Sequence, residues 1–163
     1  MNLVKLFQMQ KALDSHIEKK HQLQNEDLFS RKILALLVEL GELANETRCF
    51  KFWSVKPSSP KDVILEEFVD GVHFILSLGI ECGFDQKGMG IKAAQPECSA
   101  TEQFLSVYEG VTIFQKTKSF EDYLRLFEAY LQLAVLLGIS YEDMEQAYFS
   151  KNEVNYLRQQ NNY

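Results

Sequence analysis

Apolar residues recur every three or four positions along most of this chain, which is the spacing of one face of an α-helix. The pattern is clearest in segment 27–47, where it comprises Leu28, Ile33, Leu36, Leu37, Leu40 and Leu43. No stretch alternates apolar and polar residues in the way that a half-buried strand does. The sequence therefore predicts an all-α fold.

Residues that start and stop helices divide the chain into about six of them. The first three helices are predicted at residues 2–18, 27–47 and 60–82. Ser59 is expected to cap the third helix at its N-terminus, and Gly83 to end it. Three further starts carry a serine three residues before an acid, at Ser99 and Glu102, Ser119 and Asp122, and Ser140 and Asp143. We expect a helical bundle that forms a single domain over residues 1–163.

Charge and cysteine content argue against several classes of protein. The net charge is −6, and no basic stripe is present that could bind the phosphates of duplex nucleic acid. Cys49, Cys82 and Cys98 are odd in number and lack metal-ligand spacing, which favours reduced thiols over a disulfide framework. No segment has the apolar length of a membrane span, and the first residues do not resemble a signal peptide. We therefore expect a cytoplasmic protein whose partners include neither membranes nor duplex nucleic acid.

Two pairs of carboxylates interrupt the most apolar runs of the chain. Glu39 and Glu42 lie within LLVELGELANE, and Glu67 and Asp70 lie within VILEEFVDGVHFIL. A spacing of three places both members of a pair on one face of a helix, with their Cβ atoms about 5–6 Å apart. The turn near residues 57–60 would let two antiparallel helices bring the pairs together. The sequence therefore predicts a cluster of four acids between the second and third helices.

Such a cluster needs cations, because like charges repel and burial removes the water that stabilises them. Neither acidic run contains a lysine or an arginine. Mg²⁺ prefers oxygen ligands and is usually held by a few carboxylates, water molecules and substrate phosphates. Glu39, Glu42, Glu67 and Asp70 are therefore predicted to hold Mg²⁺.

Two other interpretations of the acids remain open. Each carboxylate could lie on the solvated face of an amphipathic helix, although two pairs at the same spacing within apolar runs weaken this interpretation. Asp70 and His73 also have the three-residue spacing of a di-iron ligand pair, but a ferritin-like site needs two such pairs. His73 is more simply a polar residue that a neighbour satisfies, and a set of oxygen ligands favours magnesium over iron.

At these residues the chain resembles the dimeric all-α dUTPases, within the wider superfamily of all-α NTP pyrophosphohydrolases. The superfamily carries E-x-x-E on one helix and E-x-x-D on the next, and the four acids match this pattern. The dimeric dUTPases add F-K-x-W, which matches residues 50–53. They also add K-N-x-x-N-x-x-R-Q before a tyrosine, which matches residues 151–159 and Tyr163. The resemblance is specific, because the three segments occur in the family's order and together span most of the chain.

The resemblance implies a nucleotide site around the metal. Phosphate contacts are expected from Lys151, Asn155 and Arg158, nucleoside contacts from Trp53 and Tyr163, and a further substrate contact from Lys51. Members of the family read uracil with polar residues of the first helix, which here are Gln10 and Asp14. Taken alone, the residues of segment 151–158 could form an ordinary polar helix face, and Trp53 could be a core anchor.

The resemblance further implies a homodimer that hydrolyses dUTP, with dUDP as a possible second substrate, and whose sites could borrow residues from the partner subunit. A metal-activated water would attack a phosphoryl group, with Glu42 and Glu39 as the catalytic carboxylates and Glu42 accepting the proton. Three alternatives stay open: another nucleotide substrate such as dCTP, a protein-binding regulator on the same scaffold, and a helical bundle without metal.

Overall fold

The computed structural model describes residues 2–91 and 94–161. This part of the chain contains six helices and no strand, which confirms the predicted all-α fold. The helices are α1 (Leu3–Lys20), α2 (Phe29–Thr47), α3 (Lys61–Glu81), α4 (Ala100–Thr117), α5 (Phe120–Leu136) and α6 (Tyr141–Gln160). No single one of these described helices is long and apolar enough to cross a membrane, although α5 and α6 meet that standard together across a bend of 108°.

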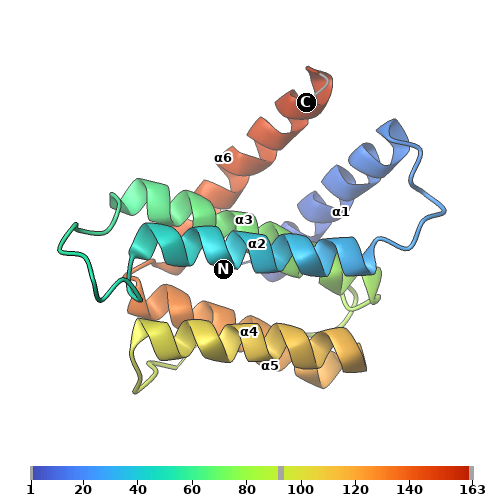
Figure 1. Cartoon of the computed structure of the whole chain (residues 1–163). Helices are drawn as coiled ribbons and strands as arrows, with labels where there is room; N and C mark the ends of the chain where they lie inside the picture. The colour runs from blue at the N-terminus through green and yellow to red at the C-terminus, as the bar shows by residue number, and fades with distance from the viewer. Residues whose placement is uncertain (1, 92–93, 162–163) are drawn as a thin grey trace.

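Helix α3 is the centre of the bundle. It contacts α1, α2, α5 and α6, and it runs antiparallel to α2 (Figure 1). Helices α4 and α5 form a second antiparallel pair below α2 and α3, whereas α1 and α6 pack on the opposite side of α3. Because neighbours cover α3 from several directions, its buried residues occupy most of its circumference rather than one stripe.

A glycine on α3 lets α5 approach closely. A Cβ atom at Gly71 would overlap the hydroxyl group of Tyr130, which donates a hydrogen bond of 2.8 Å to the carbonyl oxygen of Phe68. Gly79 makes room for Tyr123 in the same way. These contacts fix the position of α3, the helix that carries two of the predicted metal ligands.

Helix ends follow the predicted signals with one exception. The three predicted serine caps each accept a hydrogen bond from the backbone N–H three residues on, at Ser99, Ser119 and Ser140. Gly83 follows α3 with a left-handed φ of 70°. The prediction that Ser59 caps α3 is wrong, because its hydroxyl donates to the carboxylate of Glu46 on α2 instead. A backbone bond of 3.0 Å from Ser59 N–H to the Glu46 carbonyl oxygen reinforces that link.

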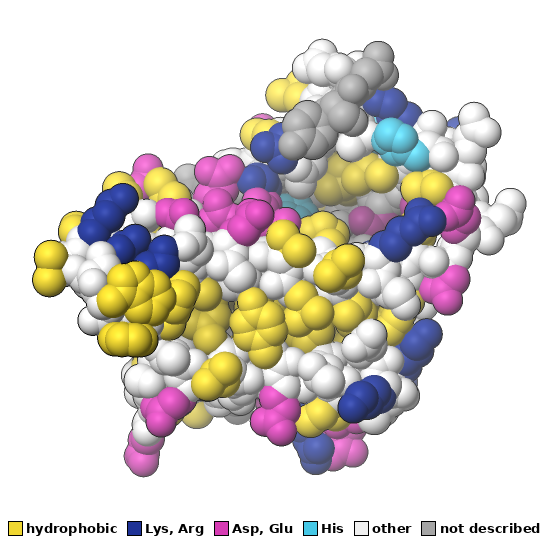
Figure 2. Space-filling view, viewed as in Figure 1, with side chains coloured by type: hydrophobic (Ala, Val, Ile, Leu, Met, Phe, Trp, Pro, Cys, Tyr) yellow, Lys and Arg dark blue, Asp and Glu magenta, His cyan; other side chains and the backbone are white. Residues whose placement is uncertain are grey.

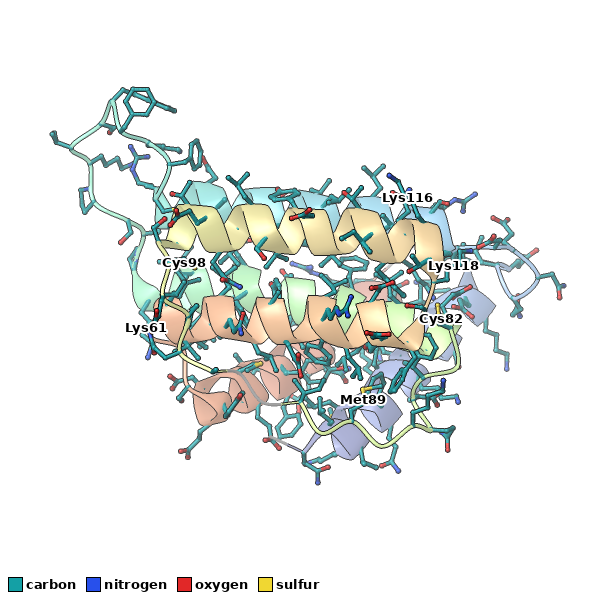
Figure 3. All side chains as sticks on the ribbon, turned by 90° about the horizontal axis from the view of Figure 1, so that it is seen from below. Lys61, Cys82, Met89, Cys98, Lys116 and Lys118 are labelled. Atoms are coloured by element: carbon teal, nitrogen blue, oxygen red, sulfur yellow. The ribbon has the colours of Figure 1, made fainter. Side chains whose placement is uncertain are left out.

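The three cysteines are free thiols, which confirms the prediction of unpaired cysteines. Figure 3 shows Cys82 and Cys98 near opposite ends of α4. A separation of this kind is far too large for a disulfide bond, whose Cα atoms lie about 4–7 Å apart.

Candidate functional site

Three of the four predicted metal ligands meet where α2 contacts α3. Glu39 on α2 and Glu67 and Asp70 on α3 each offer a carboxylate oxygen, and these oxygens all lie within 4.8 Å of one another. Glu42 lies outside this group and is exposed. Figure 2 shows acidic side chains gathered above α2 and α3, next to a hollow in the surface. The spacing of three brings Glu67 and Asp70 together on α3, and α2 adds Glu39 but not Glu42, so three of the four acids meet where the sequence predicts a cluster of four.

The clustered acids raise one another's affinity for protons. Burial raises the pKa of Glu39 to about 7, with further contributions from the negative charges of Asp70, Glu42 and Glu67. Burial is also the main cause of the raised pKa of Glu67 and of Asp70. A divalent cation would relieve this repulsion, and a donor set made of carboxylate oxygens suits Mg²⁺.

A lysine from α6 supplies part of the missing positive charge. The ammonium nitrogen of Lys151 lies 2.7 Å from Asp70 Oδ2 and 2.8 Å from Glu66 Oε1, and its side chain is 9% exposed. Neither acidic run contains this cation, and 85 residues separate Lys151 from Glu66, so the contact is not apparent in the sequence. The predicted phosphate ligand thus lies against a predicted metal ligand.

A cavity of about 200 Å³ adjoins the acids between α1, α3 and α6. Polar side chains from four helices line it: Gln10, Asp14, Glu39, Asp70, His73, Ser77, Asn155 and Arg158. Leu13, Ile17 and Phe74 add an apolar surface against which a flat ring could pack. The predicted base-reading residues and two of the three predicted phosphate-binding residues, Asn155 and Arg158, therefore surround one cavity together with two of the predicted metal ligands, whereas Lys151 is not part of its lining.

Gln10 and Asp14 belong to a buried hydrogen-bond network rather than to the protein surface. Gln10 Nε2 donates to Asp14 Oδ1 at 2.7 Å, and the Ser77 hydroxyl donates to Asp14 Oδ2 at 2.6 Å. Gln10 Oε1 accepts a hydrogen bond of 2.7 Å from the Tyr148 hydroxyl and lies 2.7 Å from His73 Nδ1. Burial raises the pKa of Asp14, although its hydrogen bonds and a nearby lysine oppose the shift. The expectation that a neighbour satisfies His73 is thus confirmed for Nδ1.

Two predicted substrate-binding residues lie away from this cavity. Lys51 and Trp53 belong to the connection between α2 and α3, which extends from one end of the bundle (Figure 1). Trp53 is 65% exposed, so it is no core anchor, and its ring packs edge-on against Phe50 and Phe52. The cavity lining formed by the described residues includes neither Lys51 nor Trp53. Tyr163 lies outside the residues that the structure describes.

Comparison with protein families identifies the chain. A family model described as dUTPase matches residues 2–163. A search of curated proteins finds no match. The family match covers both acidic pairs, the F-K-x-W segment and the C-terminal segment that carry the resemblance. Together with the all-α fold, it shows that the chain belongs to the dUTPase family and is a dUTP diphosphatase.

Proposed function

We propose that the chain splits dUTP into dUMP and pyrophosphate with Mg²⁺ held by Glu39, Glu67 and Asp70, and with Glu42 completing the ligand set. The observation that carries this proposal is the approach of three carboxylate oxygens to within 4.8 Å of one another beside the cavity. Bound Mg²⁺ would lower the pKa of an attacking water molecule and neutralise the triphosphate.

The residues of α6 are suited to hold the phosphate chain against the acids. Arg158 offers a planar fork that matches phosphate oxygens, and Asn155 offers an amide one helical turn before it. Lys151 already reaches the carboxylate of Asp70, and its ammonium group would provide a point charge to the same phosphates. Glu42 lies one turn beyond Glu39 and is exposed, so its carboxylate is available to accept the proton of the attacking water.

The polar edge of the cavity is complementary to uracil. Uracil presents an N3–H donor between two carbonyl oxygens, whereas cytosine presents an N3 lone pair beside an amino group. The carboxylate of Asp14 can accept from N3–H, and the amide of Gln10 can donate to a carbonyl oxygen. In the same pose, cytosine would place its N3 lone pair against the carboxylate of Asp14, and such a mismatch can be rejected by about four to five powers of ten. We therefore expect dUTP to be preferred over dCTP more strongly than over dTTP, which differs by one methyl group.

A second copy of this chain is the proposed protein partner. Large apolar side chains are exposed on the neighbouring helices α2 and α4, among them Leu34, Val38 and Leu105. Figure 2 shows hydrophobic side chains extending across this face. Exposed apolar patches of this kind mark interaction surfaces. Because Lys51 and Trp53 lie outside the cavity of their own chain, they would contact substrate in the cavity of a partner.

A cytoplasmic location is also proposed. All three cysteines are free, and unpaired thiols are typical of reducing compartments. Cell fractionation followed by detection of the protein tests this location, and recovery in an oxidising compartment would contradict it.

Product analysis tests the proposed reaction. The protein is incubated separately with dUTP, dCTP, dTTP and UTP, in the presence of Mg²⁺ or of EDTA, and the products are separated by ion-exchange chromatography. We expect dUMP and pyrophosphate from dUTP with Mg²⁺, and no product with EDTA. Comparable hydrolysis of dCTP would instead favour a broader pyrophosphohydrolase. No hydrolysis of any nucleotide would favour the protein-binding regulator, which a pull-down would then test.

A further inference from the structure

We propose that Tyr148 and His73 fix the orientation of the Gln10 side-chain amide, and that they thereby set which nucleobase the cavity accepts. Both are positioning residues, because they act on the base through Gln10. The inference rests on the proposed role of Gln10 in base recognition.

The orientation of the Gln10 amide matters because the side chain is 4% exposed. Its polar atoms must therefore find partners within the protein or on a ligand. An amide can adopt two orientations of nearly the same shape, which exchange the positions of its NH₂ donor and its carbonyl acceptor. The orientation thus decides whether Gln10 offers a donor or an acceptor to a base.

One side of the amide is held by Asp14. Gln10 Nε2 donates to Asp14 Oδ1 at 2.7 Å. The other carboxylate oxygen, Oδ2, accepts from the Ser77 hydroxyl at 2.6 Å and lies 4.0 Å from the ammonium group of Lys32. Rotating the amide by half a turn would place its carbonyl oxygen against a carboxylate oxygen, which is repulsive.

The other side of the amide is held by two donors. The Tyr148 hydroxyl donates to Gln10 Oε1 at 2.7 Å, and His73 Nδ1 lies 2.7 Å from the same oxygen. Burial, aided by Lys151, lowers the pKa of His73 to about 3, so its ring is neutral and carries one proton. Since Oε1 can only accept, that proton lies on Nδ1. The His73 and Tyr148 rings stack with centroids 4.2 Å apart, which keeps both donors in place.

The locked amide presents a defined edge to the cavity. Its Nε2 group has a second hydrogen, and it lies beside the carboxylate of Asp14. A donor next to an acceptor matches a uracil carbonyl next to N3–H. If the two donors at Oε1 were lost, Asp14 alone would hold the amide, and the rotated orientation, which offers its oxygen to the amino group of cytosine, would become more populated. Tyr148 and His73 therefore favour uracil over cytosine without contacting either base.

The experiment compares Tyr148→Phe with Tyr123→Phe. Both tyrosines are fully buried. Tyr123→Phe is the control, because it removes a comparable hydrogen bond away from the cavity, the 3.0 Å bond from the Tyr123 hydroxyl to the Ile75 carbonyl oxygen between α5 and α3. The measurements are kcat/KM for dUTP and dCTP, and the melting temperature of each variant. We expect the ratio of the two kcat/KM values to fall about tenfold in Tyr148→Phe, the effect of one buried hydrogen bond. The ratio should stay at its original value in Tyr123→Phe.

Gln10→Ala separates this inference from the proposed function on which it rests. A ratio that falls in Gln10→Ala but not in Tyr148→Phe would overturn the positioning role and leave base recognition by Gln10 intact. A ratio that is unchanged in Gln10→Ala, or no dUTP preference in the unmodified protein, would refute both. If Tyr148→Phe melts too early for assay, His73→Phe keeps the stacked ring and removes the other donor, and the same fall is expected.

Discussion

The ammonium group of Lys151 on α6 lies 2.7 Å from the carboxylate of Asp70 on α3, so α6 brings a cation to the three clustered acids. Asp70 is also a proposed ligand of Mg²⁺. A carboxylate oxygen that binds a metal ion cannot keep a short bond to an ammonium group, because the two cations repel each other. Mg²⁺ bound at Asp70 Oδ2 would therefore compete with Lys151 for this oxygen.

Lys151→Met should have opposite effects on stability and on metal binding. In EDTA, the free energy of unfolding of the variant should fall by about 1–3 kcal/mol. This range lies between the contributions of exposed and of fully buried ion pairs, because the Lys151–Asp70 pair is only partly buried. Without nucleotide, its affinity for Mg²⁺ should rise, because a competing cation is gone. Denaturant unfolding and isothermal titration calorimetry measure the two quantities. Lys61→Met is the control, since the Lys61–Asp143 pair is exposed. Unchanged Mg²⁺ affinity in Lys151→Met would contradict the competition.

The contribution of Glu39 to stability in EDTA should fall as the pH rises from about 5 to about 8, whereas His73, whose pKa burial lowers from 6.5 to about 3, contributes in the opposite direction at the acidic end of this range. Burial and neighbouring charges raise the pKa of Glu39 from 4.5 to about 7, so the folded protein keeps a proton that the unfolded chain releases. The stability from this proton is present below the unfolded pKa and is lost as the pH rises through the folded pKa. The raised pKa values of Glu67 and Asp70 act in the same direction.

Thermal melting across this pH range checks the expectation, in EDTA and in Mg²⁺. Mg²⁺ should reduce the fall, because it favours ionised carboxylates. Glu39→Gln should lack the contribution that falls with pH, because its amide does not titrate. An EDTA profile that is the same in Glu39→Gln as in the unmodified protein would show that Glu39 is not under the repulsion described above.

The helices could be predicted from the sequence because their causes are local. Apolar spacing defines which face of a helix is buried, and a serine cap such as Ser140 contacts the backbone only three residues away. The meeting of Glu39 with Glu67 and Asp70 was also predictable, since α2 and α3 follow each other along the chain. The N-terminus of α3 could not be predicted in this way, because the Ser59 hydroxyl donates to the carboxylate of Glu46 on α2 instead of capping α3.

The remaining contacts of the site depend on how α6 packs against α1 and α3. Lys151 reaches Glu66 across 85 residues, and Tyr148 reaches Gln10 across 138. Spacing within one segment carries no information about which residue of a distant helix will face it. The sequence therefore predicted the individual residues of the cavity better than the bonds among them.

Gln10→Ala and Asp14→Ala should each reduce the preference for dUTP over dCTP. Each variant removes one of the two groups that pair with the edge of uracil, so cytosine no longer faces a mismatched group there. The dependence on Mg²⁺ should persist, since the proposed metal ligands are intact. Measuring kcat/KM for both nucleotides tests this. Gln103→Ala is a matched control, because Gln103 is also 4% exposed and bonds the Ala129 carbonyl oxygen elsewhere.

Two inactive variants should restore activity to each other when mixed. Trp53→Ala removes a residue that is proposed to contact substrate in the partner's cavity. Glu67→Gln disables the metal site of the chain that carries it. A mixed dimer then contains one intact site, and random pairing should recover about a quarter of the original activity. The mixture is refolded together and assayed for dUTP hydrolysis. No recovery from a mixture that forms dimers would show that Trp53 does not act across the interface.

The dUTP hydrolysis rate of Glu67→Gln at saturating Mg²⁺ tests the role of the acidic cluster most directly. Glutamine keeps the size of the side chain and removes one of the charges that would draw Mg²⁺ to the three clustered acids. The rate should fall by roughly three powers of ten or more, since metal activation and charge stabilisation are lost together. Glu109→Gln, at an exposed position of α4, should keep the original rate. A normal rate in Glu67→Gln would contradict the assignment of these acids to a catalytic metal site.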